Sequence, residues 1–197
     1  DQYDFGEPWD GPNNRKLAGH KPELYHCPST WDPYHALTSY AAVVGTQADW
    51  AGSRPRTFSE FRDGTDSTIL VVETAGSGIH WMEPRDLSFD EARRGINRPD
   101  RAGISSHHVL GHGHLHHEDL VANVALADGS VRFVSDWLDP PTLEAMLTID
   151  GDEEIDLDAI LTSRPRPHWP RIVAPIALIV SYLILLLRPR KRRFGVR

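Results

Sequence analysis

The sequence predicts an α+β fold, a mainly antiparallel sheet with short helices and long irregular loops, followed by a C-terminal transmembrane helix. Three observations support this prediction. Residues 122–137 alternate apolar with small or polar side chains on both sides of Asp128-Gly129, residues 68–74 are rich in β-branched side chains, and residues 172–187 carry no charge. The first two patterns are typical of strands, and the third is typical of a membrane-spanning helix.

The pair Asp128-Gly129 predicts a β-hairpin. Val124 and Leu126 precede the pair and Val131 and Phe133 follow it, each alternating with smaller or polar residues. Asp-Gly between two such runs favours a type I′ turn, which requires positive φ at both central residues. We therefore interpret Asp128 and Gly129 as structural turn residues.

Four further segments have recognisable local patterns. Residues 40–44 and 68–74 are predicted strands, and the second of them is expected at the centre of the sheet. Ser88 and Glu91 have the spacing of a capping box and predict a short helix over residues 89–94. Proline in the first turn predicts another helix over residues 141–148.

Residues 1–39 are rich in proline, glycine and aromatic residues, without helical or strand periodicity. We predict an irregular wrap in this segment. Four of its aromatic side chains are expected to pack on the sheet: Trp9, Tyr25, Trp31 and Tyr34.

The charge of the chain is segregated along the sequence. Seven of its 21 basic residues follow Pro170, so 14 remain before that point against 28 acidic residues. The resulting formal charge of −14 makes the main part of the chain a poor partner for nucleic acid, because phosphates require a basic surface.

The apolar run of residues 172–187 has 16 residues and is preceded by Trp169 and Pro170. A span needs about 20 apolar residues, with a lower limit near 17. The basic sequence RPRKRR follows directly and marks a cytoplasmic flank. We expect a single-pass cell-membrane protein with an extracytoplasmic domain (1–150), a stem (151–170), a transmembrane helix (171–188) and a cytoplasmic tail (189–197). A buried core helix is the alternative interpretation of this run.

No catalytic motif stands out in the sequence. Ser105, His108 and Asp128 could form a triad on paper, but no nucleophile elbow is present. Cys27 is the only cysteine and lacks an activating motif, so we interpret it as an unreactive core thiol. Phosphate-binding glycine loops and Cys-x-x-Cys pairs are also absent from the sequence. We therefore predict that the chain is not an enzyme.

Residues 107–117 contain six of the eleven histidines. Alternate residues of an extended segment share a face, so three of these imidazoles could bind Zn²⁺, Cu²⁺ or Ni²⁺ together. Acidic residues that follow could add oxygen ligands. The candidate metal ligands are His112, His114, His116, His117 and Glu118. A glycine-interrupted surface loop that binds metal only adventitiously is the alternative.

Residues 150–158 alternate carboxylates at short spacing, which suits Ca²⁺. The candidate calcium ligands are Asp150, Asp152 and Glu154. The segment does not match the EF-hand pattern, because its glycine and terminal glutamate are misplaced. A solvated acidic stem is the alternative.

The order of several motifs resembles a known family. DFGEPWDGPNNRKL, YHCPS, TSYAAVVG, FRDGTDSTILVVET, SSHH and NVALADGSVRFV follow one another over residues 3–149. In this respect the chain resembles a large, uncharacterised bacterial family of pseudopilin-like proteins with a C-terminal His-x9-Asp-Gly motif. Descriptions of the family place it near general secretion pathway pseudopilins or name a transporter. His117 stands one residue too far from Asp128 to match that motif.

The resemblance and the apolar run together lead to one functional expectation. We expect a non-enzymatic, membrane-anchored, extracytoplasmic pseudopilin-like protein in envelope assembly, secretion or surface display. Its partners would be the membrane and other pseudopilin-like or envelope proteins. The alternative is a metal- or small-ligand-binding module that uses the histidine-rich loop 107–117.

Overall fold

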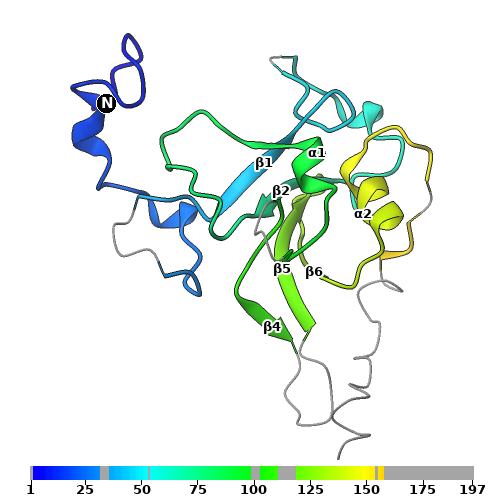
Figure 1. Ribbon diagram of the computed structural model, residues 1–197. Helices are drawn as coiled ribbons and strands as arrows, with labels where there is room; N and C mark the ends of the chain where they lie inside the picture. Colours follow the sequence, from blue (N-terminus) through cyan, green and yellow to red (C-terminus); the bar gives the residue numbers. More distant parts are fainter. Residues whose placement is uncertain are drawn as a thin grey trace, which may run out of the picture. The chain divides into compact units, whose positions relative to one another are not determined.

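The computed structural model describes residues 2–31, 36–52, 54–98, 103–110, 119–153 and 155–157. Figure 1 traces six strands through this part of the chain. They are β1 (Tyr40–Val44), β2 (Ile69–Glu73), β3 (Leu87–Ser88), β4 (His108–Leu110), β5 (Asp119–Leu126) and β6 (Val131–Ser135). The helices are α1 (Phe89–Ala92) and α2 (Pro140–Leu147), with the 3₁₀ turns η1 (Asn14–Leu17), η2 (Glu23–Tyr25) and η3 (Phe58–Glu60).

The strands form one mostly antiparallel sheet. β1 pairs with β2, β2 with β5, and β5 with both β4 and β6, all antiparallel. The short strand β3 adds a parallel pair at β1. The described residues therefore confirm a mixed sheet-and-helix fold with a mainly antiparallel sheet. β2 lies between β1 and β5, as predicted for the strand in residues 68–74 (Figure 1).

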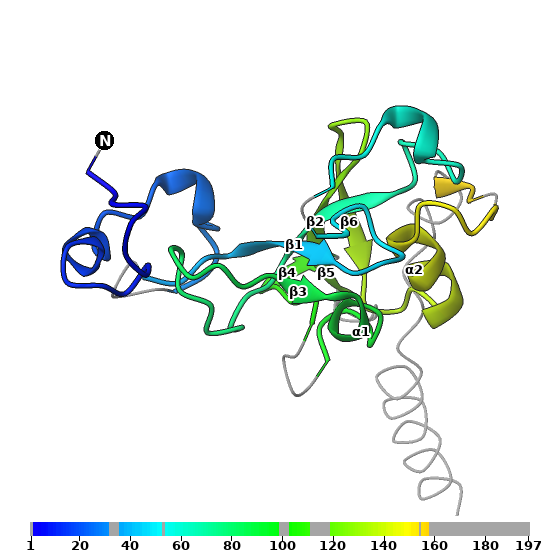
Figure 2. The same cartoon turned by 90° about the horizontal axis from the view of Figure 1, so that it is seen from above.

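One face of the sheet carries the hydrophobic core. Ala41, Val72 and Val124 are buried on this face and belong to the same cluster as side chains of both α-helices. Figure 2 shows α1 beside β3 and α2 beyond it. A register shift between Ile69 and Val71 places Ile69 on the core face as well. Strand alternation then directs the intervening side chains to the opposite face.

The predicted hairpin is present, but its turn differs from the prediction. β5 and β6 pair from Val121–Ser135 to Ala125–Val131. Only Gly129 has positive φ in this turn (+86°), so type I′ geometry, which also needs it at Asp128, is wrong. Gly129 N–H donates to Leu126 O and Leu126 N–H donates to Ser130 O. The loop therefore has three residues, the usual choice when only its last residue is left-handed.

The helix predictions hold to within two residues at each end. α1 is two residues shorter than predicted, and Ser88 and Glu91 form the predicted capping box. α2 begins one residue early, where Asp139 accepts a hydrogen bond from Thr142 N–H at the helix N-terminus. Proline occupies the first turn, as predicted.

The N-terminal segment is irregular, as predicted, but its aromatic residues contact other parts of the chain. Trp9 stacks on His80 at 4.8 Å between ring centroids. The ring centroids of Tyr25 and Trp81 lie 6.3 Å apart, and the Trp81 indole N–H donates to Ala18 O. Trp31 is 85% exposed, so the prediction that it packs on the sheet is wrong. Tyr34 lies outside the described residues.

Within the described residues, no helix is both long and apolar enough to cross a membrane. The predicted span over residues 171–188 and the tail over 189–197 lie outside the described part of the chain, as does most of the stem.

Candidate metal centre

The candidate site lies on the sheet face opposite the core. Tyr40 pairs with Glu73 across β1 and β2, and Asn123 pairs with Phe133 across β5 and β6. Asn123 N–H donates to Glu73 Oε2, which joins the two pairs into one row. His108 pairs with Val121 on the same face, two residues from Asn123 along β5. Strand alternation and register thus place the side chains of Glu73, Asn123 and His108 side by side.

Cys27 joins this row from the N-terminal segment. Its backbone N–H donates to Ser39 Oγ at 2.9 Å, and Ser39 N–H donates to Tyr25 O at 2.8 Å. Ser39 directly precedes β1 and its carbonyl accepts from Thr74 N–H. These bonds fix the loop after η2 onto the sheet, and the Cys27 side chain is only 1% exposed.

Glu73 is a fully buried carboxylate at the end of the central strand, with 0% exposure. Its Oε2 atom accepts two hydrogen bonds, one from the backbone N–H and one from the side-chain amide of Asn123, both at 3.0 Å. Its Oε1 atom has no partner with full hydrogen-bond geometry within the described residues, but it lies 3.1 Å from His108 Nε2, close enough for an ion pair if the imidazole is protonated. A buried carboxylate oxygen without a partner costs free energy unless a cation or donor compensates it.

This oxygen is one of three potential ligand atoms that lie close together. His108 Nε2 lies 3.1 Å from Glu73 Oε1 and 3.4 Å from Cys27 Sγ. All three atoms lie within 4.8 Å of one another. His108 is the most accessible member, with a side chain 22% exposed. The three residues come from segments far apart in the sequence, so only the folded chain assembles the cluster.

The amide of Asn123 contacts two members of the cluster. Asn123 Nδ2 lies 3.1 Å from His108 Nε2 as well as 3.0 Å from Glu73 Oε2. An amide nitrogen only donates, so Nε2 accepts this hydrogen bond in the tautomer that leaves its lone pair unprotonated. A metal ion bound at Nε2 would replace this contact, because both use the same lone pair.

The environment keeps the thiol protonated when no cation is bound. Burial, reinforced by the Glu73 carboxylate, raises the pKa of Cys27. Burial also raises the pKa of Tyr40 to about 12, with further contributions from Cys27 and Glu73. A raised thiol pKa is the opposite of what an activated cysteine nucleophile needs.

The geometry also separates this cluster from a cysteine–histidine catalytic pair. In such a pair one imidazole nitrogen faces the nucleophile and the other faces an orienting residue. Here Cys27, Glu73 and Asn123 all approach the same nitrogen, Nε2 of His108. This arrangement therefore differs from a catalytic pair, and it places the thiol and the carboxylate on the same side of the imidazole nitrogen.

Two of the three ligand separations can be compared with those of a tetrahedral zinc site. Zinc bonds of about 2.3 Å to sulfur and about 2.0–2.2 Å to nitrogen and oxygen put neighbouring ligand atoms roughly 3.3–3.6 Å apart. The Sγ–Nε2 separation of 3.4 Å lies within this range, the Nε2–Oε1 separation of 3.1 Å lies slightly below it, and Sγ and Oε1 lie within 4.8 Å of each other. The residues therefore could hold a metal ion after a small outward movement of the side chains.

Most of the site residues predicted from the sequence lie outside the described part of the chain. His112, His114, His116, His117 and Glu118 are outside the described residues, as is Glu154. Asp150 and Asp152 are described, and the backbone N–H groups of Gly151 and Asp152 donate to Asp63. Their calcium site stays a prediction, because its third ligand is not described. Asp128 and Gly129 occupy the hairpin turn as predicted.

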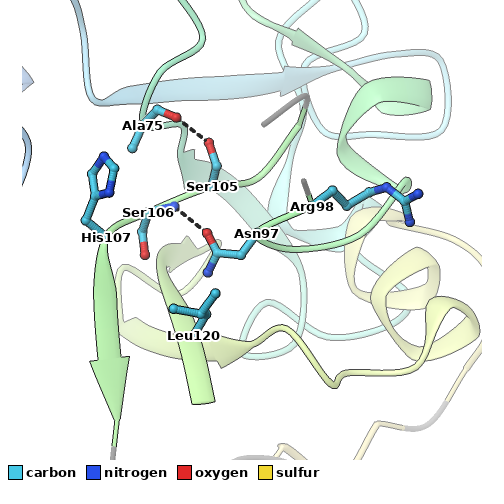
Figure 3. Close-up of a pocket in the computed structure, with 7 residues that line it drawn as sticks. All are labelled: Ala75, Asn97, Arg98, Ser105, Ser106, His107 and Leu120. Atoms are coloured by element: carbon cyan, nitrogen blue, oxygen red, sulfur yellow. Dashed lines mark hydrogen bonds between the residues drawn. The ribbon is translucent and has the colours of Figure 1, made fainter. Parts of the chain in front are cut away.

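A hollow of about 400 Å³ lies near the start of β4 (Figure 3). In this view the Arg98 guanidinium points away from His107, so the two basic side chains that line the hollow do not converge. Ser105 Oγ donates to Ala75 O and Ser106 N–H donates to Asn97 Oδ1. Ser105 is therefore engaged with the backbone, and Asp128 accepts from Ser130 N–H in the hairpin turn. The triad drawn from Ser105, His108 and Asp128 has no support in these contacts.

Sequence reasoning missed Glu73 and interpreted Cys27 as a core thiol without a role. The predicted burial of Cys27 is confirmed, but its contacts with His108 and Glu73 were not predicted. A signal was nevertheless present: the motifs YHCPS, TILVVET, SSHH and NVALADGS contain Cys27, Glu73, His108 and Asn123 in turn. Four motifs that are distant in sequence, each with one potential ligand or hydrogen-bonding side chain, indicate a shared site.

No protein-family model, curated protein or solved structure matches this chain. The resemblance to pseudopilin-like proteins therefore stays a prediction.

Proposed function

We propose that the described domain is a metal-binding module in which Cys27 Sγ, Glu73 Oε1 and His108 Nε2 bind a divalent transition metal ion. The observation that carries this proposal is the convergence of three ligand atoms, from a thiol, a fully buried carboxylate and an imidazole, within 4.8 Å of one another. A bound cation would compensate the carboxylate and fix the positions of three separate chain segments.

The ligand types favour Zn²⁺. Sulfur, imidazole nitrogen and carboxylate oxygen are the three ligand classes that zinc uses in proteins. A thiolate and a carboxylate together carry two negative charges, which balance a divalent ion in a buried site. Ca²⁺ and Mg²⁺ select oxygen ligands and are disfavoured by the thiolate. Metal binding would displace the proton that the raised pKa keeps on Cys27.

Titration of the full chain with Co²⁺, followed by competition with Zn²⁺, tests this proposal. A cobalt–thiolate charge-transfer band reports ligation by Cys27 directly, because the chain has no other cysteine. We expect one saturable site with this band. Cys27→Ser should abolish the band, and Glu73→Gln and His108→Gln should weaken binding while keeping the size of each side chain.

Two control variants separate this site from the histidine-rich loop. His107→Gln removes an exposed imidazole next to His108, and a His112/His114/His116→Ala variant removes the ligands predicted from the sequence. Both should keep the charge-transfer band. Absence of saturable binding in the unmodified chain, or binding that survives Cys27→Ser and disappears with the loop variant, would contradict the proposal.

A second proposal concerns where this module works. The apolar residues 172–187 and the basic residues that follow favour a membrane-anchored, extracytoplasmic protein of the pseudopilin-like kind. This role in envelope assembly, secretion or surface display involves no chemical reaction. Removing residues 169–197 should release the domain from the membrane fraction, and continued membrane association of the shortened chain would contradict the anchor.

A further inference from the structure

An apolar hollow of about 570 Å³ continues along the sheet face that carries the candidate metal centre. Val71, Ala125 and Val131 line its floor, and Tyr40 and Asn123 line the end nearest the cluster. The opposite wall is residues 23–26, directly before Cys27. Volumes of about 300–1,000 Å³ with mainly apolar walls are typical of small-ligand sites.

Strand register shows how the hollow and the cluster are connected. Ala42, Val71, Ala125 and Val131 form a row of paired residues across β1, β2, β5 and β6. The polar row that contains Glu73 and Asn123 is the next row on the same face, two residues along each strand. Two residues of strand span about 7 Å, so the apolar floor begins within one side-chain length of the cluster.

Two residues belong to both features. Asn123 contacts His108 and Glu73 through its amide and also lines the hollow. Tyr40 lines the hollow, and Cys27 and Glu73 both contribute to the raised pKa of its hydroxyl group. A ligand in the hollow would therefore reach the cluster past these two side chains.

A zinc ion at the candidate centre would also have an open coordination position. Cys27, Glu73 and His108 supply three ligands among the described residues, whereas zinc takes four. Sites with three protein ligands keep the fourth position for water or an exogenous ligand. Because the thiolate and the carboxylate already balance a divalent ion, this position would accept a neutral or singly charged group.

We infer that the hollow and the metal ion together form a binding site for a small molecule with an apolar body and a metal-coordinating head. The body lies over Val71, Ala125 and Val131, and the head takes the fourth position on the metal. This inference rests on the proposed metal-binding function and adds the class of ligand that the site selects.

Binding of octanohydroxamic acid and acetohydroxamic acid to the full chain tests the inference. Both carry the same metal-coordinating head, but only the first has an apolar body. On the Zn²⁺-loaded chain we expect the octanoyl compound to bind about 100-fold more tightly, the gain for roughly four methylene groups leaving water. Removal of Zn²⁺ by a chelator should abolish this binding. Calorimetry measures both effects.

A matched pair of variants locates the apolar body. Val131 is 61% exposed at the hollow, and Val109 is an exposed valine on β4 outside the hollow's lining. Val131→Asp should weaken the octanoyl compound at least about tenfold and leave the acetyl compound unchanged. Val109→Asp should change neither. Retention of the cobalt–thiolate band in both variants shows that each is folded.

The outcomes distinguish the two proposals. If Co²⁺ and Zn²⁺ do not bind, the proposed function fails and this inference fails with it. If they bind through Cys27 but the two hydroxamates bind equally, or the octanoyl compound binds equally without metal, only the inference is overturned.

Discussion

Asn123 is the residue on which the geometry of the candidate centre depends most directly. Its amide donates to Glu73 Oε2 and so orients this carboxylate, while its contact at 3.1 Å to His108 Nε2 would be replaced by the metal ion. Partners that orient metal ligands typically contribute a factor of 10–100 in metal affinity. The backbone N–H of Asn123 also donates to Oε2 and is retained in any substitution.

Asn123→Ala should therefore weaken Zn²⁺ binding about 10- to 100-fold without abolishing it. Competition with a fluorescent zinc chelator measures the change. Arg132→Ala is the control, because Arg132 is exposed on the neighbouring strand and pairs with Val124. Equal affinities for the Asn123→Ala variant and the unmodified chain would show that the amide does not orient the carboxylate.

At the residue scale, the sequence predicted the turn residues and missed the cluster, for a physical reason. Asp128 and Gly129 act through local backbone geometry, which a few neighbouring residues determine. Cys27 lies near His108 only because Ser39 fixes its loop onto β1, a contact between segments that no local pattern encodes. The burial of Glu73 depends likewise on the pairing of β2 with β1 and β5.

At the scale of elements, the short helix α1 depends on its capping box. Ser88 N–H and Ser88 Oγ both donate to Glu91 Oε2, at 2.9 Å and 2.5 Å. These bonds lower the pKa of the Glu91 carboxyl. The folded state therefore favours the ionised form, and its stabilisation is complete only above the unfolded pKa of about 4.3.

Glu91→Gln should lower the free energy of unfolding at pH 7, by at most about 1 kcal/mol because the site is partly exposed. The difference from the unmodified chain should shrink as the pH falls from about 5 through the lowered pKa, since Glu91 is then protonated in both states. Urea unfolding at several pH values measures this. Asp90→Asn is the comparison variant: it makes the same charge change on α1, leaves the capping box intact and removes the surface ion pair with Arg93 instead.

Two glycines test how tightly the elements pack. Gly103 (φ +88°) and Gly129 (φ +86°) share a left-handed conformation, but a Cβ at Gly103 would lie 2.5 Å from Glu91 O, whereas Gly129 faces open space. Gly129→Ala should cost about 1 kcal/mol from its conformation alone. Gly103→Ala should cost clearly more. Similar urea midpoints for the two variants would show that the backbone beside α1 moves readily.

The sequence predicted the helices and strands that have a clear local pattern and missed those that have none. β1, β2 and the β5–β6 hairpin have β-branched or alternating patterns, and α1 and α2 have capping residues. β3 and β4 have only two and three residues and carry no such signal. β4 exists because its residues pair with Val121, Leu120 and Asp119 of β5, and this pairing brings His108 into the cluster.

At the scale of the whole molecule, the two faces of the sheet carry different kinds of side chains. One face packs against α1 and α2 and supplies the core. The other carries the polar row and the apolar hollow beneath residues 23–26. The N-terminal segment contacts this face through Cys27, which bonds to Ser39 and lies 3.4 Å from His108. A metal ion bound by Cys27, Glu73 and His108 would therefore connect this segment to the sheet.

Metal binding should consequently stabilise the whole domain. An ion that binds only the folded state adds about 2.7 kcal/mol at a concentration of 100 times Kd. For a chain of this size that corresponds to a rise in Tm of roughly 5–10 °C. Differential scanning calorimetry with and without Zn²⁺ measures the rise. At the same Zn²⁺ concentration the rise should be clearly smaller in Glu73→Gln and unchanged in the His112/His114/His116→Ala variant. An undiminished rise in Glu73→Gln would place the stabilising ion elsewhere. No rise in the unmodified chain at saturating Zn²⁺ would mean that the unfolded chain binds the ion as well, so the fold would not create the site.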